Sequence, residues 1–375
     1  MARAPSSFRF PAVAGALRIA VAAFALQCGA AAQAQQTLLG IYYGNQGWAI
    51  DQLRAMEAWQ GKRHAVVNLF TDWCSRPKSI DNLFKQQLPA IWANGNVPLI
   101  TWEPFLCSAG ATPADVMVRA ARGDYSTYLN AWAERLRAFV AGPDGVVGNA
   151  DDRRVYIRLA HEMNGNWYPW SVGSGGTTGA HYIETWRLTR AIFSGKGLTS
   201  HNVQWVWSVN HEDVGSGTAE QAWPGDHQVD WIAVDGYNWG ASQSWSAPRT
   251  PQQVFGPMVE RLRALSARPL ALTETASTSA FVPGGVDLAA KSAWIGQLFG
   301  YAATQDVRML VWFNEDKETD WAIFGGSAGT ETWRAGRTTY KAYTAYRQGV
   351  QPAALVGGDP AHPRRIGDAQ FQGAW

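Results

Sequence analysis

The segment Arg154-Val155-Tyr156-Ile157-Arg158-Leu159-Ala160-His161-Glu162 changes abruptly from a strand pattern to polar residues. Residues 154–160 are β-branched and apolar enough to form a buried strand. Glu162 should therefore lie where a strand ends and a loop begins. In barrel enzymes this is the position of the catalytic groups.

Strand-like segments recur along the whole chain and alternate with helix-like segments. The predicted strands are 38–43, 65–71, 97–102, 155–160, 203–209, 231–237, 270–273 and 308–313. Amphipathic spacing predicts helices over 79–93, 125–140, 181–193, 251–265, 291–303 and 338–347. Thr250, Pro251 and Gln253 form a good helix start, whereas the Gly- and Pro-bearing segment 213–227 is expected to be mostly loop.

Eight strands each followed by a helix predict an α/β fold, a single-domain (β/α)8 TIM barrel over residues 35–350. A doubly wound open sheet is the alternative. No linker marks a second domain. The tail 351–375 is rich in Pro and Gly and lacks periodicity, so we expect an irregular or disordered terminus, although Phe371 and Trp375 could pack back on the barrel.

The first 34 residues have the pattern of a secretory signal peptide. Three arginines precede the apolar run 19–26, and Ala32-Gln33-Ala34 supplies small residues at the expected cleavage spacing, so cleavage is expected near Ala34. The apolar run is too short to span a bilayer, and the residue before Cys28 does not suit a lipoprotein signal. We therefore expect a secreted protein without a membrane anchor.

Two cysteines, Cys74 and Cys107, remain after the predicted cleavage. An oxidising compartment allows them to pair, and both follow strands predicted to be neighbours. A disulfide is therefore favoured over two free buried thiols.

The composition argues against nucleic acid and strongly charged partners, because 375 residues carry a net charge of only +2. The outlier is the count of 20 tryptophans. Such an excess indicates a cleft built for stacking on sugar rings, and the alternative is a Trp-rich core. The aromatics Trp167, Tyr168 and Trp170 directly after Glu162 favour the first interpretation. We expect a monomer that binds a polysaccharide.

A second glutamate completes a candidate carboxyl pair. Glu274 ends the predicted strand 270–273, and strands four and seven of a barrel face each other across its mouth. Retaining glycosidases need two carboxyls about 5 to 5.5 Å apart, one as acid/base and one as nucleophile. Glu162, among aromatics, suits the acid; Glu103, Asp235 and Glu315 also follow strands and rank lower.

Arg158 lies four residues before Glu162, on the same face of the strand, and can supply positive charge to Glu274. Its alternative role is an ordinary ion pair inside the barrel. Tyr237, at the end of strand six, could donate a hydrogen bond to the nucleophile.

The motif Arg158-x-x-His161-Glu162-Met163-Asn164-Gly165-x-Trp167, with Thr273-Glu274, resembles glycoside hydrolase family 26 from residue 38 to residue 347. The resemblance implies a (β/α)8 retaining hydrolase of β-1,4-mannan, mixed-linkage β-1,3-1,4-glucan or β-1,3-xylan, acting without metal or organic cofactor. It places Glu162 as acid/base and Glu274 as nucleophile. The residues expected to bind substrate are Arg158, His161, Asn164, Trp167, Trp170, Tyr237, Trp239 and Trp312.

The substrate is expected to be a β-1,3-1,4- or β-1,4-glucan. Many mannanases of the family have Phe-Trp-Trp after the motif tryptophan, whereas this chain has Tyr168-Pro169-Trp170, and the segment 311–321 looks like the glucanase branch. A mannanase, a β-1,3-xylanase or an enzyme acting on the producer's own exopolysaccharide is the alternative. From another class, a non-catalytic polysaccharide-binding protein is disfavoured, because a binder needs no second carboxylate.

Other motifs are rejected or left open. His161-Glu162 lacks the second histidine of a zinc protease, because position 165 is Gly. The esterase-like Gly325-x-Ser327-x-Gly329 does not follow a strand. The loop 144–152 offers oxygen ligands for calcium but matches no complete calcium loop. His211-Glu212-Asp213, Trp239 and Trp245 could line the cleft.

Overall fold

The structure is a computed structural model that describes Met1, residues 35–45 and residues 49–375. The predicted signal peptide, apart from Met1, lies outside the described residues. Residues Gln35–Trp375 form one compact unit. Among the described residues, no helix combines the length and apolarity needed to cross a membrane.

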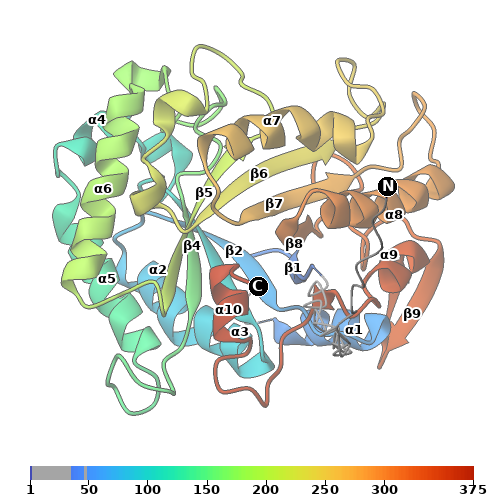
Figure 1. The fold of residues 1–375 in the computed structure, drawn as a ribbon, viewed down its shortest axis with the longest axis horizontal. Helices are drawn as coiled ribbons and strands as arrows, with labels where there is room; N and C mark the ends of the chain where they lie inside the picture. Colours follow the sequence, from blue (N-terminus) through green and yellow to red (C-terminus); the bar gives the residue numbers. More distant parts are fainter. Residues whose placement is uncertain (2–34, 46–48) are drawn as a thin grey trace. The chain divides into compact units, whose positions relative to one another are not determined.

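Eight parallel strands form a closed barrel (Figure 1). Successive strands pair with each other, and β1 also pairs with β8, from Leu38 beside Met309 to Tyr42 beside Phe313. This closure confirms the barrel and excludes the open sheet. The strands are β1 Thr37–Tyr42, β2 Val66–Asp72, β3 Val97–Glu103, β4 Val155–Leu159, β5 Val203–Asn210, β6 Trp231–Asn238, β7 Leu270–Ser277 and β8 Val307–Phe313.

Helices surround the barrel and agree with most of the predicted segments. They are α1 Ile50–Gln60, α2 Pro77–Asn82, α3 Leu88–Asn94, α4 Val116–Ala121, α5 Ser126–Val140, α6 Gly179–Gly195, α7 Pro251–Leu265 and α8 Leu288–Thr304. The predicted helix 79–93 is interrupted by a π-helical turn, Leu83–Gln87. Thr250 and Gln253 make the expected capping box of α7. After β5 only short 3-10 turns form, as predicted for 213–227.

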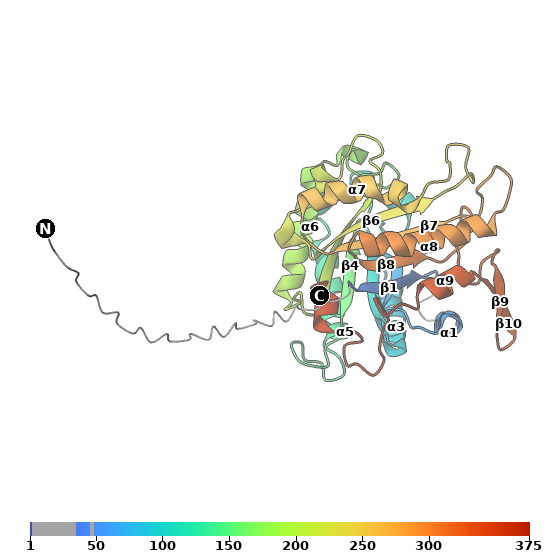
Figure 2. The same ribbon diagram turned by 45° about the vertical axis from the view of Figure 1, so that its right-hand side comes forward.

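The prediction of a helix over 338–347 is wrong. A hairpin of β9 Glu331–Ala335 and β10 Thr338–Ala342 precedes a short helix, α9 Thr344–Gly349. The run Thr338-Thr339-Tyr340 favours a strand, and Tyr340 stacks on Phe324 at 4.6 Å between ring centroids. Figure 2 shows the hairpin at the outside of the barrel, next to α9.

The prediction of an irregular tail is also wrong in part. Residues Leu355–Val356 form β11, which pairs with β1, and Asp368–Gln372 form α10. Phe371 is fully buried against Tyr156 near the start of β4, and the Tyr156 hydroxyl donates to the Phe371 carbonyl at 3.0 Å. The tail therefore covers the amino-terminal end of the barrel.

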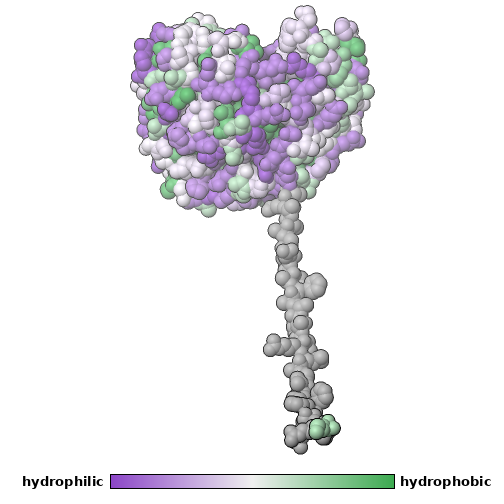
Figure 3. Space-filling model, turned by 45° about the horizontal axis from the view of Figure 1, so that its top comes forward, coloured by the Kyte–Doolittle hydropathy of each residue, from purple (hydrophilic) through white to green (hydrophobic). Residues whose placement is uncertain are grey.

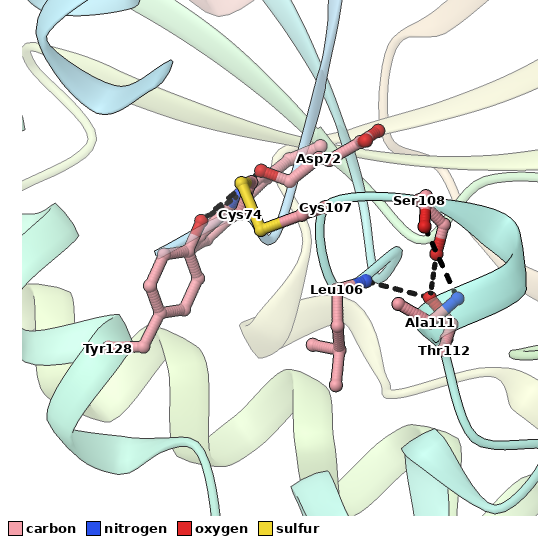
Figure 4. The surroundings of a disulfide bond; sticks show 9 residues. Asp72, Cys74, Leu106, Cys107, Ser108, Ala111, Thr112 and Tyr128 are labelled. Carbon is pink, nitrogen blue, oxygen red and sulfur yellow. Dashed lines mark hydrogen bonds between the residues drawn. A yellow bond between two sulfur atoms is a disulfide. The ribbon is translucent and has the colours of Figure 1, made fainter. Parts of the chain in front are cut away.

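A disulfide joins Cys74, after β2, to Cys107, after β3, with their Cα atoms 4.2 Å apart (Figure 4). Nearby, the Tyr128 hydroxyl donates to the Asp72 carbonyl, and the Leu106 amide donates to the Thr112 hydroxyl. The bond thus ties together two loops that begin at the carboxyl ends of neighbouring strands.

Candidate active site

A cavity of about 610 Å³ opens at the carboxyl ends of the strands. Figure 3 shows one face of the molecule, where hydrophilic residues are widespread and hydrophobic residues appear at several places among them. The residues that line the cavity are Phe70, Glu162, Trp167, Tyr168, Asn210, His211, Glu212, Val214, Tyr237, Trp239, Trp245, Ser246, Ala247, Arg249, Glu274, Phe313, Lys317, Glu318 and Trp321.

A sharp turn after β4 directs Glu162 into this cleft. Ala160 and Glu162 both have left-handed backbone conformations, with φ of 47° and 54°. Such angles are uncommon for residues other than glycine and persist only where the surroundings fix them. Here the Glu162 amide donates to the Ser208 carbonyl at 3.0 Å, and the buried Trp170 indole donates to the His161 carbonyl at 2.7 Å.

The environment of Glu162 favours its protonated form. Burial raises the pKa of Glu162 well above its usual value, and the nearby carboxylates of Asp235 and Glu274 raise it further. The Trp167 indole N–H donates to Glu162 Oε2 at 3.0 Å and opposes that shift. A glutamate that retains its proton near neutrality is suited to act as a general acid.

The surroundings of Glu274 differ from those of Glu162, because Glu274 contacts a guanidinium cation. Arg158 Nη2 donates to its Oε1, and the Tyr237 hydroxyl donates to its Oε2. Both predicted partners of the candidate nucleophile are therefore in place, and they fix the orientation of its carboxylate. The same guanidinium donates to Asp235 Oδ2 at 2.7 Å and, through Nε, to the Thr101 hydroxyl at 2.9 Å.

A bulge explains how consecutive residues of β7 reach the barrel interior. Beside β6, Val234 pairs with Leu272 but Asp235 pairs with Glu274, so Thr273 is the extra residue. The Thr273 hydroxyl then donates to Asp235 Oδ1 at 2.7 Å while Glu274 contacts Arg158. Burial raises the pKa of Asp235 to about 7. The Arg158 charge opposes this shift, and the Glu274 carboxylate adds to it.

His161 lies beside the nucleophile candidate, with Nε2 3.7 Å from Glu274 Oε1. Burial and the Arg158 charge hold its pKa well below the usual value, so the imidazole is neutral. His161, Asp235 and Glu274 bring potential metal ligands within 4.8 Å of one another. Arg158, however, already contacts both carboxylates, so a cation is present in this cluster without a metal.

Five of the eight residues predicted to bind substrate do not line the cleft: Arg158, His161, Asn164, Trp170 and Trp312. Asn164, Trp170 and Trp312 have 0%, 0% and 1% of their surface exposed. Asn164 donates to the Asn210 carbonyl, and Trp312 donates to the Trp321 carbonyl. Asn164, Trp170 and Trp312 are buried behind the cleft surface, and contact with sugar stays a prediction for all five residues.

The Trp170 ring stacks on Tyr168 at 4.2 Å and thereby supports a cleft residue that the sequence indicated only as one of the aromatics after Glu162. The Tyr168 hydroxyl lies 3.3 Å from His161 Nε2. Phe70, Phe313 and Trp321 were not predicted as cleft residues, although each lies in or after a strand at its carboxyl end. Their positions near or after strand ends were the feature of the sequence that could have identified them as cleft residues.

Several residues had roles that the sequence alone did not decide, and only some of them line the cleft. Trp239 and Trp245 line the cleft with ring centroids 5.3 Å apart, and Trp245 is 70% exposed. His211 and Glu212 also line it, whereas Asp213 accepts a hydrogen bond from Asn164. In the calcium-ligand loop 144–152, Asp144 already accepts bonds from Val146 and Asn149.

Glu103 occupies another part of the same barrel end. It lies beside Asp72 in register on the neighbouring strand. Burial, and next the charge of Asp72, raise the pKa of Glu103 to about 8.

The barrel with two carboxyls near its mouth defines a glycoside hydrolase. Residues 67–257, just over half of the chain, match the family model described as Glycosyl hydrolase family 26. Endoglucanase H of Acetivibrio thermocellus is 30% identical over 291 residues, which are 76% of this chain and 28% of that protein. The chain thus spans little more than a quarter of this relative.

Solved structures agree on the fold. BoMan26A, a β-mannanase from Bacteroides ovatus, has a TM-score of 0.58 at 19% identity, covering 88% of this chain and 93% of that one. The catalytic domain of an endo-β-1,4-mannanase from Bacillus sp. JAMB-750 has a TM-score of 0.60 at 16% identity, covering 90% of each chain. The chain belongs to glycoside hydrolase family 26.

We predict that Arg158→Met lowers the free energy of unfolding by about 3–5 kcal/mol, because it leaves buried carboxylates without their cation. Chemical denaturation measures this loss. Arg119→Met breaks an exposed pair with Asp115 and serves as the control, for which we expect a far smaller change. Equal stability of the two variants would contradict the central role of Arg158.

Proposed function

We propose that the chain is a secreted, retaining endo-β-glycanase that hydrolyses β-1,3-1,4- or β-1,4-glucan within the barrel domain 35–350. The observation that carries the proposal is the unequal environment of Glu162 and Glu274 in one cleft. Glu162 is held toward its protonated form, whereas Glu274 contacts a guanidinium and a hydroxyl. These are the properties that an acid and a nucleophile require.

In the proposed reaction, Glu274 attacks the anomeric carbon while Glu162 donates its proton to the departing glycosidic oxygen. A glycosyl-enzyme forms, and the leaving sugar diffuses away. Glu162, now ionised, removes a proton from water, which attacks the anomeric carbon and releases Glu274. Two inversions give net retention. Neither step needs a cofactor.

Support for glucan as substrate comes from the similarity to Endoglucanase H and from the run Tyr168-Pro169-Trp170. Endo-β-1,4-mannanase activity is the second candidate, because the similar solved structures include several β-mannanases. In either case Trp167, Trp239 and Trp245 offer indole faces to sugar rings in the cleft. The proposal includes action as a monomer, after cleavage near Ala34.

We expect mixed-linkage β-1,3-1,4-glucan to give the highest kcat/KM in a panel with carboxymethyl cellulose, mannan and β-1,3-xylan. Release of reducing sugar, with product sizes from chromatography, measures the preference and tests endo action. Faster cleavage of mannan would support the mannanase alternative. Binding of any of these polysaccharides without product would support the non-catalytic alternative.

We predict that Glu274→Ala reduces kcat by at least roughly 10³-fold, because the covalent intermediate can no longer form. Circular dichroism and thermal melting should show that the variant remains folded. Glu184→Ala, an exposed glutamate on α6, is the control and should retain wild-type activity. A folded, active Glu274→Ala enzyme would exclude Glu274 as nucleophile.

Trp167→Phe should shift the alkaline limb of the kcat/KM–pH profile to higher pH. The indole N–H stabilises the ionised Glu162, so its removal raises the pKa of that group, and the acid remains protonated to higher pH. Trp223→Phe, outside the cleft, should leave the limb in place. If the alkaline limb of Trp167→Phe stays at the same pH or moves to lower pH, the result would argue against Glu162 as the acid.

A further inference from the structure

We propose that Lys291 is a positioning residue for the polysaccharide: its buried ammonium holds the segment 314–324 so that Trp321 forms one wall of the cleft. We call this segment the β8 loop. The inference rests on the proposed function, because it assigns Lys291 a role in substrate binding. Lys291 itself does not line the cleft.

Lys291 extends from α8 into the protein and is completely buried. Its Nζ donates to the carbonyls of Asp320 and Ala322, the second at 3.0 Å. The same Nζ lies 3.6 Å from Asp320 Oδ2 and 4.6 Å from the centroid of the Tyr343 ring. One ammonium therefore binds the residues on both sides of Trp321.

Trp321 connects these contacts to the substrate site. Its ring centroid lies 5.1 Å from that of Tyr237 and 4.8 Å from that of Trp239. Tyr237 donates to Glu274, and Trp239 lines the cleft. A displacement of Trp321 would therefore alter the surface against which a bound sugar packs.

The two ends of the β8 loop have separate attachments. Asn314 Oδ1 accepts hydrogen bonds from the amides of Ile323 and Phe324, and Asp316 Oδ1 accepts one from Ala322. Removal of Lys291 leaves these bonds in place. The carbonyls of residues 320 and 322 would, however, lose the donor that Lys291 provides, so the effect should be confined to the Trp321 region.

The charges around Lys291 suit an ammonium ion. Burial lowers the pKa of Lys291 to about 8, and the carboxylates of Asp320 and Asp316 oppose the shift. At neutral pH the side chain therefore remains largely protonated. Methionine would occupy a similar volume but donate no hydrogen bond, whereas arginine would retain the charge and the donors.

The test compares Lys291→Met and Lys291→Arg with the wild type and with Lys85→Met, which removes an exposed lysine charge. Amide hydrogen exchange of residues 314–324 reports the loop directly, without any substrate. Kinetics are measured on mixed-linkage β-glucan and on an aryl β-glucoside that occupies little more than the subsite of the cleaved sugar.

In Lys291→Met we expect faster exchange confined to the β8 loop. We also expect KM for the polysaccharide to rise roughly tenfold, the effect of losing about one aromatic contact, with kcat on the aryl glucoside within about threefold of wild type. Lys291→Arg should restore most of the polysaccharide KM. The increases in KM from Lys291→Met and Trp321→Ala should not add, because both act through the same ring.

Unchanged exchange in the β8 loop, an unchanged KM for polysaccharide, or additive effects of the two substitutions would each overturn the inference. If Lys291→Met does not fold, Lys291→Gln, which loses the charge but retains an N–H donor, is judged by the same outcomes. A wild-type enzyme inactive on every glycan would instead contradict the proposed function, and hydrogen exchange would still decide whether Lys291 orders the loop.

Discussion

The guanidinium of Arg158, shared between Asp235 and Glu274, is the interaction on which the site depends. A buried carboxylate is costly unless it is paired, and here two of them converge inside a barrel. One fixed cation contacts both. It also makes the proposed division of roles possible, because Glu162 has no such partner and its burial favours the proton.

Two local irregularities of the backbone give these groups their directions. The bulge at Thr273 lets neighbouring residues of β7 both point inward, which regular alternation would forbid. The left-handed turn at Ala160 and Glu162 ends β4 and aims the carboxyl into the cleft. Both irregularities lie where charged groups must meet, while the rest of each strand follows the regular barrel pattern.

The sequence was sufficient to predict the barrel, because eight strand-like segments recur with helix-like segments between most of them. It also placed Glu162, Glu274 and Arg158 at the same end of the barrel, since strand ends and strand faces follow from counting residues. The same reasoning could not show that Trp170 and Trp312 are buried, because an aromatic residue near a strand end can either line the cleft or pack behind it. The packing of Phe371 and the contacts of Lys291 depend on partners distant in sequence, which local patterns do not reveal. The hairpin after residue 330 is local, and its β-favouring run Thr338-Thr339-Tyr340 was present in the sequence.

Closure of the barrel has a consequence for the order of folding. β1 completes its pairing with β8, and the Thr37 hydroxyl donates to the carbonyl of Val307, 270 residues away. The Trp375 indole donates to the carbonyl of Gln36, across 339 residues. During synthesis the first strand can pair early with β2, but it must wait for β8 until about 270 more residues have been made. Such long-range contacts form slowly, so the nascent protein has an extended period in which chaperones can bind it.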